Sequence, residues 1–242
     1  MPKPKDVMEE RETEIGKILK YLSSKTRGFE NPKLVLIGGY ALRNYVPFAR
    51  YSRDCDFALK ENLDKIEKFK PGNMILETFE RKASFAFMRW VKITEIGGRK
   101  VKTGVDFMES EIRGRKSEIF RIDDKFLESS KRTKLRVGTE CEVFVPDYTD
   151  LFLLKIISAR RSDIRDIAAM VWENGVPKNL TKRAKEVTNF FIVENKLKDV
   201  IIPDISDPLF VHSFRGTFIT EKFGKPEQEV VVKRLKGILK AR

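Results

Sequence analysis

The chain has 242 residues, of which 41% are hydrophobic, and its 49 Lys and Arg against 36 Asp and Glu give a net charge of +13. This length allows one large domain or two small ones, with enough apolar residues for a sizeable core. The two cysteines and one histidine are too few for a disulfide framework, a cysteine-rich zinc site or catalysis by several histidines. The excess of positive charge favours a polyanionic partner, nucleic acid first.

The hydropathy of the chain points to the cytoplasm, with no membrane partner. No apolar run approaches the roughly 20 residues of a membrane span, and the N-terminal stretch lacks the apolar core of a secretion signal. Charged residues make up 35% of the chain and Gln228 is its only glutamine, a composition typical of thermophile proteins. Thermophily does not account for the excess of basic residues, so nucleic-acid contact stays the favoured interpretation.

Helical and strand patterns alternate in the first half of the chain. Apolar residues at helical spacing indicate helices, and short apolar or β-branched runs indicate strands. The patterns predict a helix at 7–24, a strand at 33–37, a helix at 40–45, a strand at 54–59 and a helix at 61–69.

Two hairpins follow, and the composition then becomes helical. The first hairpin joins strands at 84–93 and 101–108 around Gly97 and Gly98, and the second joins 134–137 and 142–145 around Gly138 and Thr139. After Pro146, the patterns predict helices at 150–159, 163–172, 180–194 and 227–240. The chain is therefore predicted to be an α+β protein with a mixed sheet, divided into a β-rich core at 1–146 and a mainly helical region at 147–242.

A pair of glycines followed by a pair of aspartates is the most informative motif. Gly38 and Gly39 end an apolar strand and precede a helix, so backbone amides there can meet a phosphate. Asp54 and Asp56 should face the same way on their strand, with Cys55 on the buried face. Two like charges held so close repel, and a hard divalent cation is the usual resolution. The combination indicates chemistry on a nucleoside triphosphate.

A third carboxylate, Asp106, lies in an otherwise apolar predicted strand, where an unpaired charge is costly. A metal shared with Asp54 and Asp56 would supply its partner. Three carboxylates can hold two Mg²⁺ ions about 4 Å apart, the arrangement used for in-line displacement at phosphorus. We therefore expect these three residues to be catalytic and to bind Mg²⁺ or Mn²⁺. The alternative for the glycine pair with Asp54 and Asp56 is a tight turn with ordinary solvated acids, and that for Asp106 is a lone strand aspartate.

A basic and acidic cluster lies in the predicted helical region. Asp163 and Asp166 are three residues apart and share a helix face. Lys155, on the preceding helix, could reach a triphosphate as a point charge. The alternative is a salt-bridged pair of helices with no contact to a ligand.

These residues resemble the motifs of the nucleotidyltransferase superfamily, the DNA polymerase β-like group. Its pattern is Gly-Gly or Gly-Ser, a helix, Asp-x-Asp, and a third acid on a later strand. The matching residues here are Gly38 and Gly39, Asp54 and Asp56, and Asp106. The resemblance covers roughly residues 30 to 170.

Within that superfamily, the chain looks most like AbiEii-type nucleotidyltransferases, the toxin halves of some toxin–antitoxin systems. Their approach to the acids, Arg-x-Ser/Thr-x-Asp-x-Asp, matches Arg50 and Ser52 ahead of the two aspartates. Their later motif, a Lys followed by an Asp-x-x-Asp helix, matches Lys155, Asp163 and Asp166.

The resemblance implies a metal-dependent enzyme that moves a nucleoside monophosphate from a nucleoside triphosphate to an acceptor hydroxyl. It implies a C-terminal helical region that closes over the nucleotide. The implied nucleotide-binding residues are Gly38, Gly39, Ser52, Lys155, Asp163 and Asp166. Ser52 is expected to supply the hydroxyl that a small residue after the glycines often supplies in the family, since Tyr40 stands there in this chain.

Several alternatives stay open on the sequence alone. The basic charge favours RNA, such as a tRNA end, as the acceptor, while a protein hydroxyl would make the chain a protein-modifying enzyme. The AbiEii likeness implies an antitoxin-like protein partner. A non-catalytic nucleotide-binding or nucleic-acid-binding module on the same fold is the alternative from a different functional class.

Overall fold

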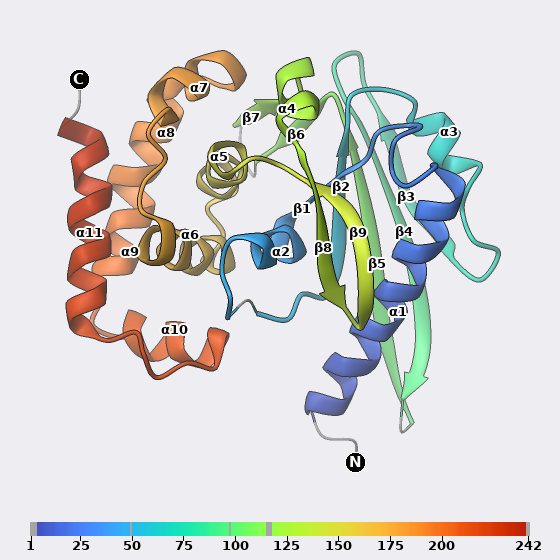
Figure 1. Ribbon diagram of the computed structural model, residues 1–242, viewed down its shortest axis with the longest axis horizontal. Coiled ribbons are helices and arrows are strands. Elements are labelled where there is room, and N and C mark those ends of the chain that lie inside the picture. The colour runs from blue at the N-terminus through green and yellow to red at the C-terminus, as the bar shows by residue number, and fades with distance from the viewer. Residues whose placement is uncertain (1–3, 49, 97, 115–117, 241–242) are drawn as a thin grey trace. The chain divides into compact units, whose positions relative to one another are not determined.

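The computed structural model describes residues 4–48, 50–96, 98–114 and 118–240, and Figure 1 shows its helices and strands. The chain divides into two compact units. The first, which we call the sheet unit, comprises Met1–Ala41, Tyr51–Ile112 and Ile122–Asp147. The second, the helical unit, comprises Leu42–Arg50, Arg113–Arg121 and Tyr148–Arg242. Two segments from the first half of the chain thus group with the helices of the second half.

Within the described residues, the sheet unit contains a seven-stranded sheet of order β3-β4-β5-β2-β1-β9-β8. Its strands are β1 (Val35–Ile37), β2 (Asp54–Leu59), β3 (Ile75–Arg81), β4 (Ala86–Ile96), β5 (Arg99–Glu109), β8 (Lys131–Val137) and β9 (Thr139–Val145). β2 runs parallel to β5 and β1 runs parallel to β9, whereas the other neighbours are antiparallel. The predicted mixed sheet is therefore confirmed.

The sheet unit also carries the helices α1 (Pro4–Lys25), α2 (Gly38–Ala41), α3 (Leu63–Glu67) and α4 (Asp124–Ser129). α1 packs against β5, β8 and β9, as its course along these strands in Figure 1 illustrates. Its apolar face is buried at Ile15, Ile18, Leu19 and Leu22, which confirms the predicted helix. Burying such aliphatic side chains contributes about 1.5–3 kcal/mol each.

A row of aromatic rings forms the core beneath β2. Phe57 stacks between Phe29 and Phe107, with ring centroids 5.6 and 5.7 Å away. Trp90 continues the row at 4.7 Å from Phe107. Cys55 shares the buried face and is 1% exposed, as predicted. Because strand side chains alternate, this apolar face leaves the half-buried Asp54 and Asp56 together on the other face.

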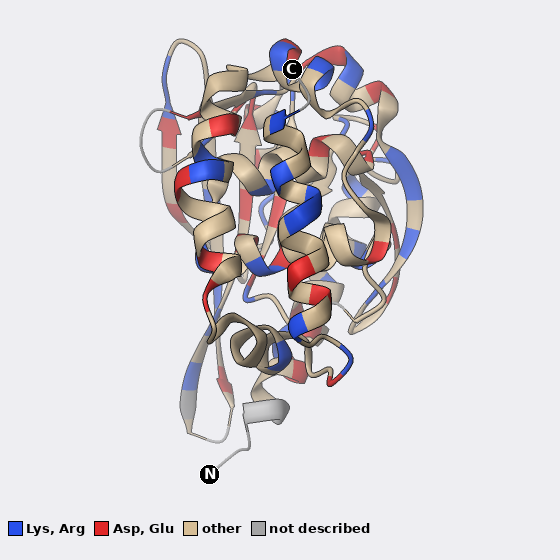
Figure 2. Cartoon of the chain, turned by 90° about the vertical axis from the view of Figure 1, so that its left-hand side faces the viewer, with Lys and Arg blue, Asp and Glu red and all other residues tan. Residues whose placement is uncertain are grey.

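The helical unit is built around α5 (Tyr148–Ser158), whose residues from Asp150 to Ile157 are all buried. α6 (Arg161–Asn174) packs on α5, and α11 (Lys225–Lys240) packs on α6. The other elements are η1 (Leu42–Asn44), β7 (Ile119–Arg121), α7 (Leu180–Val187), α8 (Phe190–Lys196), η2 (Leu197–Ile201), α9 (Ile202–Ser206) and α10 (Phe210–Phe218). Figure 2 shows basic and acidic residues interspersed along these helices. The predicted C-terminal helical region is confirmed.

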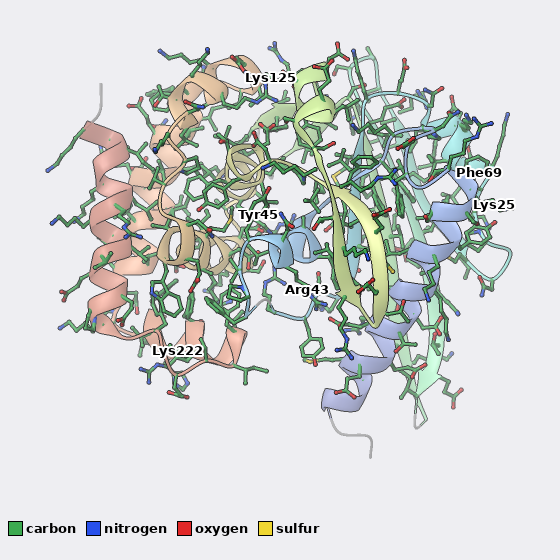
Figure 3. All side chains as sticks on the ribbon, in the orientation of Figure 1. Lys25, Arg43, Tyr45, Phe69, Lys125 and Lys222 are labelled. Atoms are coloured by element: carbon green, nitrogen blue, oxygen red, sulfur yellow. The ribbon has the colours of Figure 1, made fainter. Side chains whose placement is uncertain are left out.

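Aromatic side chains hold the helical unit together at two places. Phe214 stacks on Phe223 with centroids 3.9 Å apart, and Trp172 packs edge-on against both rings. Tyr45, labelled in Figure 3, packs on Tyr148 at 5.3 Å. The Tyr148 hydroxyl lies 2.8 Å from the Met170 carbonyl oxygen and 2.7 Å from that of Gly175. Burial raises the pKa of this phenol, so it stays protonated and available as a donor.

Several elements differ from the predicted ones. The helix predicted at 180–194 is divided into α7 and α8, because Thr188 is extended and Asn189 caps α8 by accepting from the amide of Phe191 at 3.0 Å. The exposed edge strand β3, the helices α4, α9 and α10, and the short strands β6 (Glu111–Arg113) and β7 were not predicted. Of the first hairpin's glycines, Gly98 has a φ of +77°, while Gly97 lies outside the described residues.

In the part of the chain that the structure describes, no helix is long and apolar enough to cross a membrane.

The buried ion pair between Asp150 and Arg183 provides a test of the helical unit. Arg183 donates to both Asp150 oxygens, at 2.7 and 3.2 Å, with both side chains at most 5% exposed. We expect Asp150→Ala to lower the free energy of unfolding by about 3–5 kcal/mol, since it leaves a buried guanidinium without that partner. Urea denaturation measures this. Glu186→Ala is the control, because Glu186 also contacts Arg183 but is 33% exposed. Equal losses in the two variants would contradict the expectation.

Candidate active site

The Gly38–Gly39 turn lies directly against the carboxylate of Asp56. Gly38 follows β1 with a φ of +73°, and Ile37 is the register partner of Asp56 on β2. A Cβ atom on Gly38 would stand 2.2 Å from Oδ2 of Asp56. Both the left-handed backbone and the lack of space therefore require glycine at position 38.

A second glycine makes room for the other aspartate. Asp54 on β2 is the register partner of Gly104 on β5. A Cβ atom on Gly104 would stand 2.6 Å from Oδ1 of Asp54. Gly104 was not predicted as a site residue, although a glycine inside a strand pattern is a sign of close approach by another group. Each aspartate of the pair thus lies over a glycine.

Asp106 is the register partner of Asp56 on the neighbouring strand, so their side chains emerge side by side from the same face. Asp106 is 6% exposed. Arg89 on β4 donates to both of its oxygens, from Nε at 2.6 Å and from Nη2 at 2.5 Å. These hydrogen bonds raise the pKa of the Arg89 guanidinium, which stays charged. Arg89 therefore compensates part of the negative charge of Asp106, a role that was expected of a metal ion. This partner becomes visible only through the pairing of β4 with β5.

The three acids match a divalent cation in their chemistry but not in their present arrangement. Carboxylate oxygens are the ligands that Mg²⁺ prefers. Among the described residues, however, no group of three or more His, Cys, Asp or Glu side chains is placed to hold a metal ion. Asp106 has both oxygens engaged by Arg89. Metal binding by Asp54, Asp56 and Asp106 stays a prediction.

Ser52 and Tyr40 organise the start of β2. The Ser52 hydroxyl donates to the carbonyl oxygen of Asp54 at 3.0 Å. The Tyr40 hydroxyl donates to the carbonyl oxygen of Ser52, also at 3.0 Å. Tyr40 therefore ties its helix to the chain that leads into Asp54.

In the helical unit, Lys155 lies between two aspartates. Its ammonium donates to Asp163 at 2.9 Å and to Asp166 at 2.7 Å, and the residue is only 3% exposed. Asp166, which is fully buried, also accepts two hydrogen bonds from Arg50, at 2.9 and 3.0 Å. The structure therefore brings the predicted Lys155, Asp163 and Asp166 together and adds Arg50. Asp166 anchors the residue that stands four positions before Asp54 in the chain.

The charges of this cluster stabilise one another. Burial acts to lower the pKa of Lys155, but the charges of Asp163 and Asp166 outweigh it and raise that pKa above its ordinary value. Burial likewise acts to raise the pKa of Asp163, but the charge and hydrogen bond of Lys155 outweigh it and lower that pKa. The ammonium and the Asp163 carboxylate are therefore both charged at neutral pH.

Substitution of Gly38 tests the close approach of the turn to Asp56. We expect Gly38→Ala to lower the free energy of unfolding by at least about 1–2 kcal/mol, the cost of a left-handed backbone, because Cβ also displaces the Asp56 carboxylate. Gly237→Ala is the matched control, since its Cβ would meet no atom within 4 Å. That change lies within α11 and should be neutral or stabilising by up to about 1 kcal/mol. Urea denaturation of both variants checks the contrast, which equal stabilities would contradict.

The lowered pKa of Asp163 predicts a pH dependence of stability. A carboxyl whose pKa is lower in the folded state stabilises the fold above its unfolded pKa of about 3.9, and that contribution is lost as the pH falls through the folded value. We expect Asp163→Asn to be clearly destabilising at pH 7 and progressively less so below about pH 4. Denaturant titrations of both proteins across this range measure the difference. A destabilisation that stays constant with pH would contradict it.

Comparison with known proteins leaves the family of the chain open. No protein-family model matches it, and no curated protein matches it. Two solved structures from Helicobacter pylori are similar over most of their length. One, a "putative nucleotidyltransferase", has 15% identity and a TM-score of 0.45, covering 91% of this chain and 94% of that one. The other, JHP933, has 16% identity and a TM-score of 0.42, covering 91% of each chain. Neither likeness is close enough to assign an activity.

Proposed function

We propose that the chain is a nucleotidyltransferase that moves a nucleoside monophosphate from a nucleoside triphosphate to an acceptor hydroxyl. The observation that carries the proposal is the contact between the Gly38 turn and the Asp56 carboxylate, with Asp54 on the same strand face. A turn without side chains lets backbone amides meet phosphate oxygens. Adjacent carboxylates are the groups that phosphoryl-transfer sites place beside such a turn.

In the proposed reaction, an oxygen of the acceptor hydroxyl forms a bond to the α-phosphorus, and the bond between the α-phosphorus and its bridging oxygen to the β-phosphate breaks. Pyrophosphate leaves with the electron pair of that bond. The hydroxyl proton passes to a carboxylate of the site, for which we assign Asp106. Both Asp106 oxygens accept hydrogen bonds from Arg89, so Arg89 has to share the carboxylate or turn away from it when Asp106 takes up the proton.

Mg²⁺ or Mn²⁺ is the proposed cofactor, held by Asp54 and Asp56 and, after release from Arg89, by Asp106. When bound, such an ion supplies Lewis-acid stabilisation of charge on the phosphate oxygens. Gly38 and Gly39 are assigned to the phosphates, and Ser52 to the geometry of Asp54 through its 3.0 Å hydrogen bond.

For Lys155, Asp163 and Asp166, the contacts favour positioning of the chain over direct contact with the nucleotide. The Lys155 ammonium already donates to two carboxylates and is buried. Asp166 joins Lys155 to Arg50 and so fixes the end of the segment that leads toward Asp54. Contact of Lys155 with a triphosphate, as the sequence motif implies, would have to use the third N–H of an ammonium that is 3% exposed.

One observation favours a second candidate function, a non-catalytic nucleotide-binding or nucleic-acid-binding module. The pairing of Asp106 with Arg89 neutralises one of the three acids without a metal. A binding module needs no catalytic ion, and a stable Arg89–Asp106 pair would suit it. Three neighbouring acids, on the other hand, oppose the binding of a polyanion unless they take part in chemistry, so we place this function second.

The acceptor is proposed to be RNA, on the basis of the net charge of +13. A protein hydroxyl is the other acceptor considered, as in protein-modifying enzymes. A role as the toxin of a toxin–antitoxin pair rests on the AbiEii-like motifs alone, and co-purification of a small protein that blocks the transfer would support it.

Transfer of radiolabel tests the proposed function. Each of the four α-³²P-labelled nucleoside triphosphates is incubated with the protein, Mg²⁺ or Mn²⁺, and total RNA. We expect label on RNA, loss of label with a chelator, and at least a 100-fold loss in Asp56→Ala, in keeping with removal of a group that acts in the transition state. Asp64→Ala is the control, because Asp64 is an exposed aspartate of the same unit, paired with Arg81.

The outcomes separate the candidate functions. Label on the protein itself would keep the chemistry and overturn the RNA acceptor. Full activity in a folded Asp56→Ala would contradict the assigned site. Absence of label under every condition, with nucleotide still bound, would favour the binding module.

A further inference from the structure

A cavity of about 500 Å³ adjoins Asp54 on the sheet unit, and basic side chains dominate its lining. The cations come from four separate elements or their edges. They are Arg11 of α1, Arg53 just before β2, Arg89 of β4, and Lys100 and Lys102 of β5. We call this cavity the basic pocket. Among the described residues that line it, Asp54 is the one acid.

Three of these five cations have no ion-pair partner among the described residues. Arg89 pairs with Asp106, and Lys102 pairs with Glu77. Arg11, Arg53 and Lys100 form no such pair within residues 4–48, 50–96, 98–114 and 118–240. In addition, Nε of Arg11 is buried without a hydrogen-bond partner. A buried guanidinium nitrogen left unsatisfied is costly, so an anionic ligand would stabilise this arrangement.

We propose that the basic pocket binds the phosphate backbone of a polynucleotide acceptor and thereby brings its terminal hydroxyl to Asp54. This inference rests on the proposed nucleotidyl transfer and names the substrate subsite of that reaction. Three uncompensated cations spread over one pocket match consecutive phosphates of a strand better than a single small anion. Guanidinium groups also bind phosphate oxygens in a bidentate manner.

The sheet order favours the acceptor over the nucleoside triphosphate as the occupant. β2 lies between β1 and β5, and the Gly38 turn follows β1. Arg89, Lys100 and Lys102 lie on β4 and β5, on the opposite side of β2. In an in-line displacement, the attacking and leaving oxygens are on opposite sides of the phosphorus. If the triphosphate is held at the glycine turn, the basic pocket therefore stays available for the acceptor polynucleotide, whose hydroxyl attacks from the other side.

Charge-neutralising substitutions test the proposal. The triple variant Arg11→Gln, Arg53→Gln, Lys100→Gln removes the three unpaired cations. The matched control Lys20→Gln, Lys178→Gln, Lys222→Gln removes three exposed lysines outside the pocket and gives the same net charge; Lys222 is labelled in Figure 3. Fluorescence anisotropy of a labelled single-stranded RNA measures the affinity of each protein over a range of salt concentrations.

We expect the pocket variant to bind RNA more weakly, with the slope of log K against log salt reduced by about 2, from three phosphate contacts at about 0.7 each. The control should retain most of the wild-type slope. An equal reduction in both variants would overturn the proposal, because the affinity would then follow net charge alone. Binding of poly-glutamate with the same dependence on the pocket would also overturn it, in favour of an acidic protein partner.

Two further measurements keep the test decisive. Lys100→Glu alone reverses one exposed charge, so it should weaken RNA binding even if the triple variant fails to fold. Affinity for a nucleoside triphosphate, measured by calorimetry, should be unchanged in Lys100→Glu; a loss there with RNA binding intact would reassign the pocket to the nucleotide and overturn the inference. Pocket-dependent RNA binding without any label transfer by the wild-type protein would refute the proposed enzyme while leaving the RNA site.

Discussion

Repulsion among Asp54, Asp56 and Asp106 is the constraint on which the candidate site depends. Register pairing of β2 with β5 places three carboxylates on one face of two adjacent strands. The glycines at positions 38 and 104 leave room for Asp56 and Asp54. The two hydrogen bonds from the Arg89 guanidinium neutralise Asp106. Such an arrangement is retained where a function needs concentrated charge, since apolar residues on these strands would be simpler to accommodate.

The opposite face of β2 explains why the strand tolerates these charges. Phe57 and its neighbouring rings form a continuous apolar layer beneath it. Burial of these aromatic side chains stabilises the strand, while Asp54 and Asp56 lie half-buried on its other face. In the helical unit, the charged groups are buried instead. Asp166 accepts hydrogen bonds there from both Lys155 and Arg50, so the buried charges compensate one another. The half-buried Asp54 and Asp56 are exposed enough to meet a ligand. The enclosed cluster of Lys155, Asp166 and Arg50 is suited to holding the chain in place.

Charge balance also distinguishes the surfaces. Around Asp54, basic residues outnumber acids, and three of them have no ion-pair partner in the part of the chain that the structure describes, so the electrostatic potential there favours an anion despite the nearby aspartates. The helices of the second unit carry both basic and acidic residues, as Figure 2 shows, and Arg215 pairs with Glu221 at their surface. The proposed role of the excess charge therefore rests on the cations that the described part of the fold leaves uncompensated next to Asp54.

The α+β class, most helices and strands, and the motifs around Gly38, Asp54, Asp56 and Asp106 could be predicted from the amino-acid sequence, because period-2 and period-3.6 patterns and glycine pairs are local signals. The sequence could not determine that Arg89 is the partner of Asp106 or that Gly104 lies beneath Asp54, since strand register depends on pairing between distant segments. The break between α7 and α8 was missed because periodicity continues across it. The place of Arg11 in the basic pocket and the pairing of Asp166 with Arg50 are visible only in the folded chain, because such contacts arise from packing and leave no trace in local spacing.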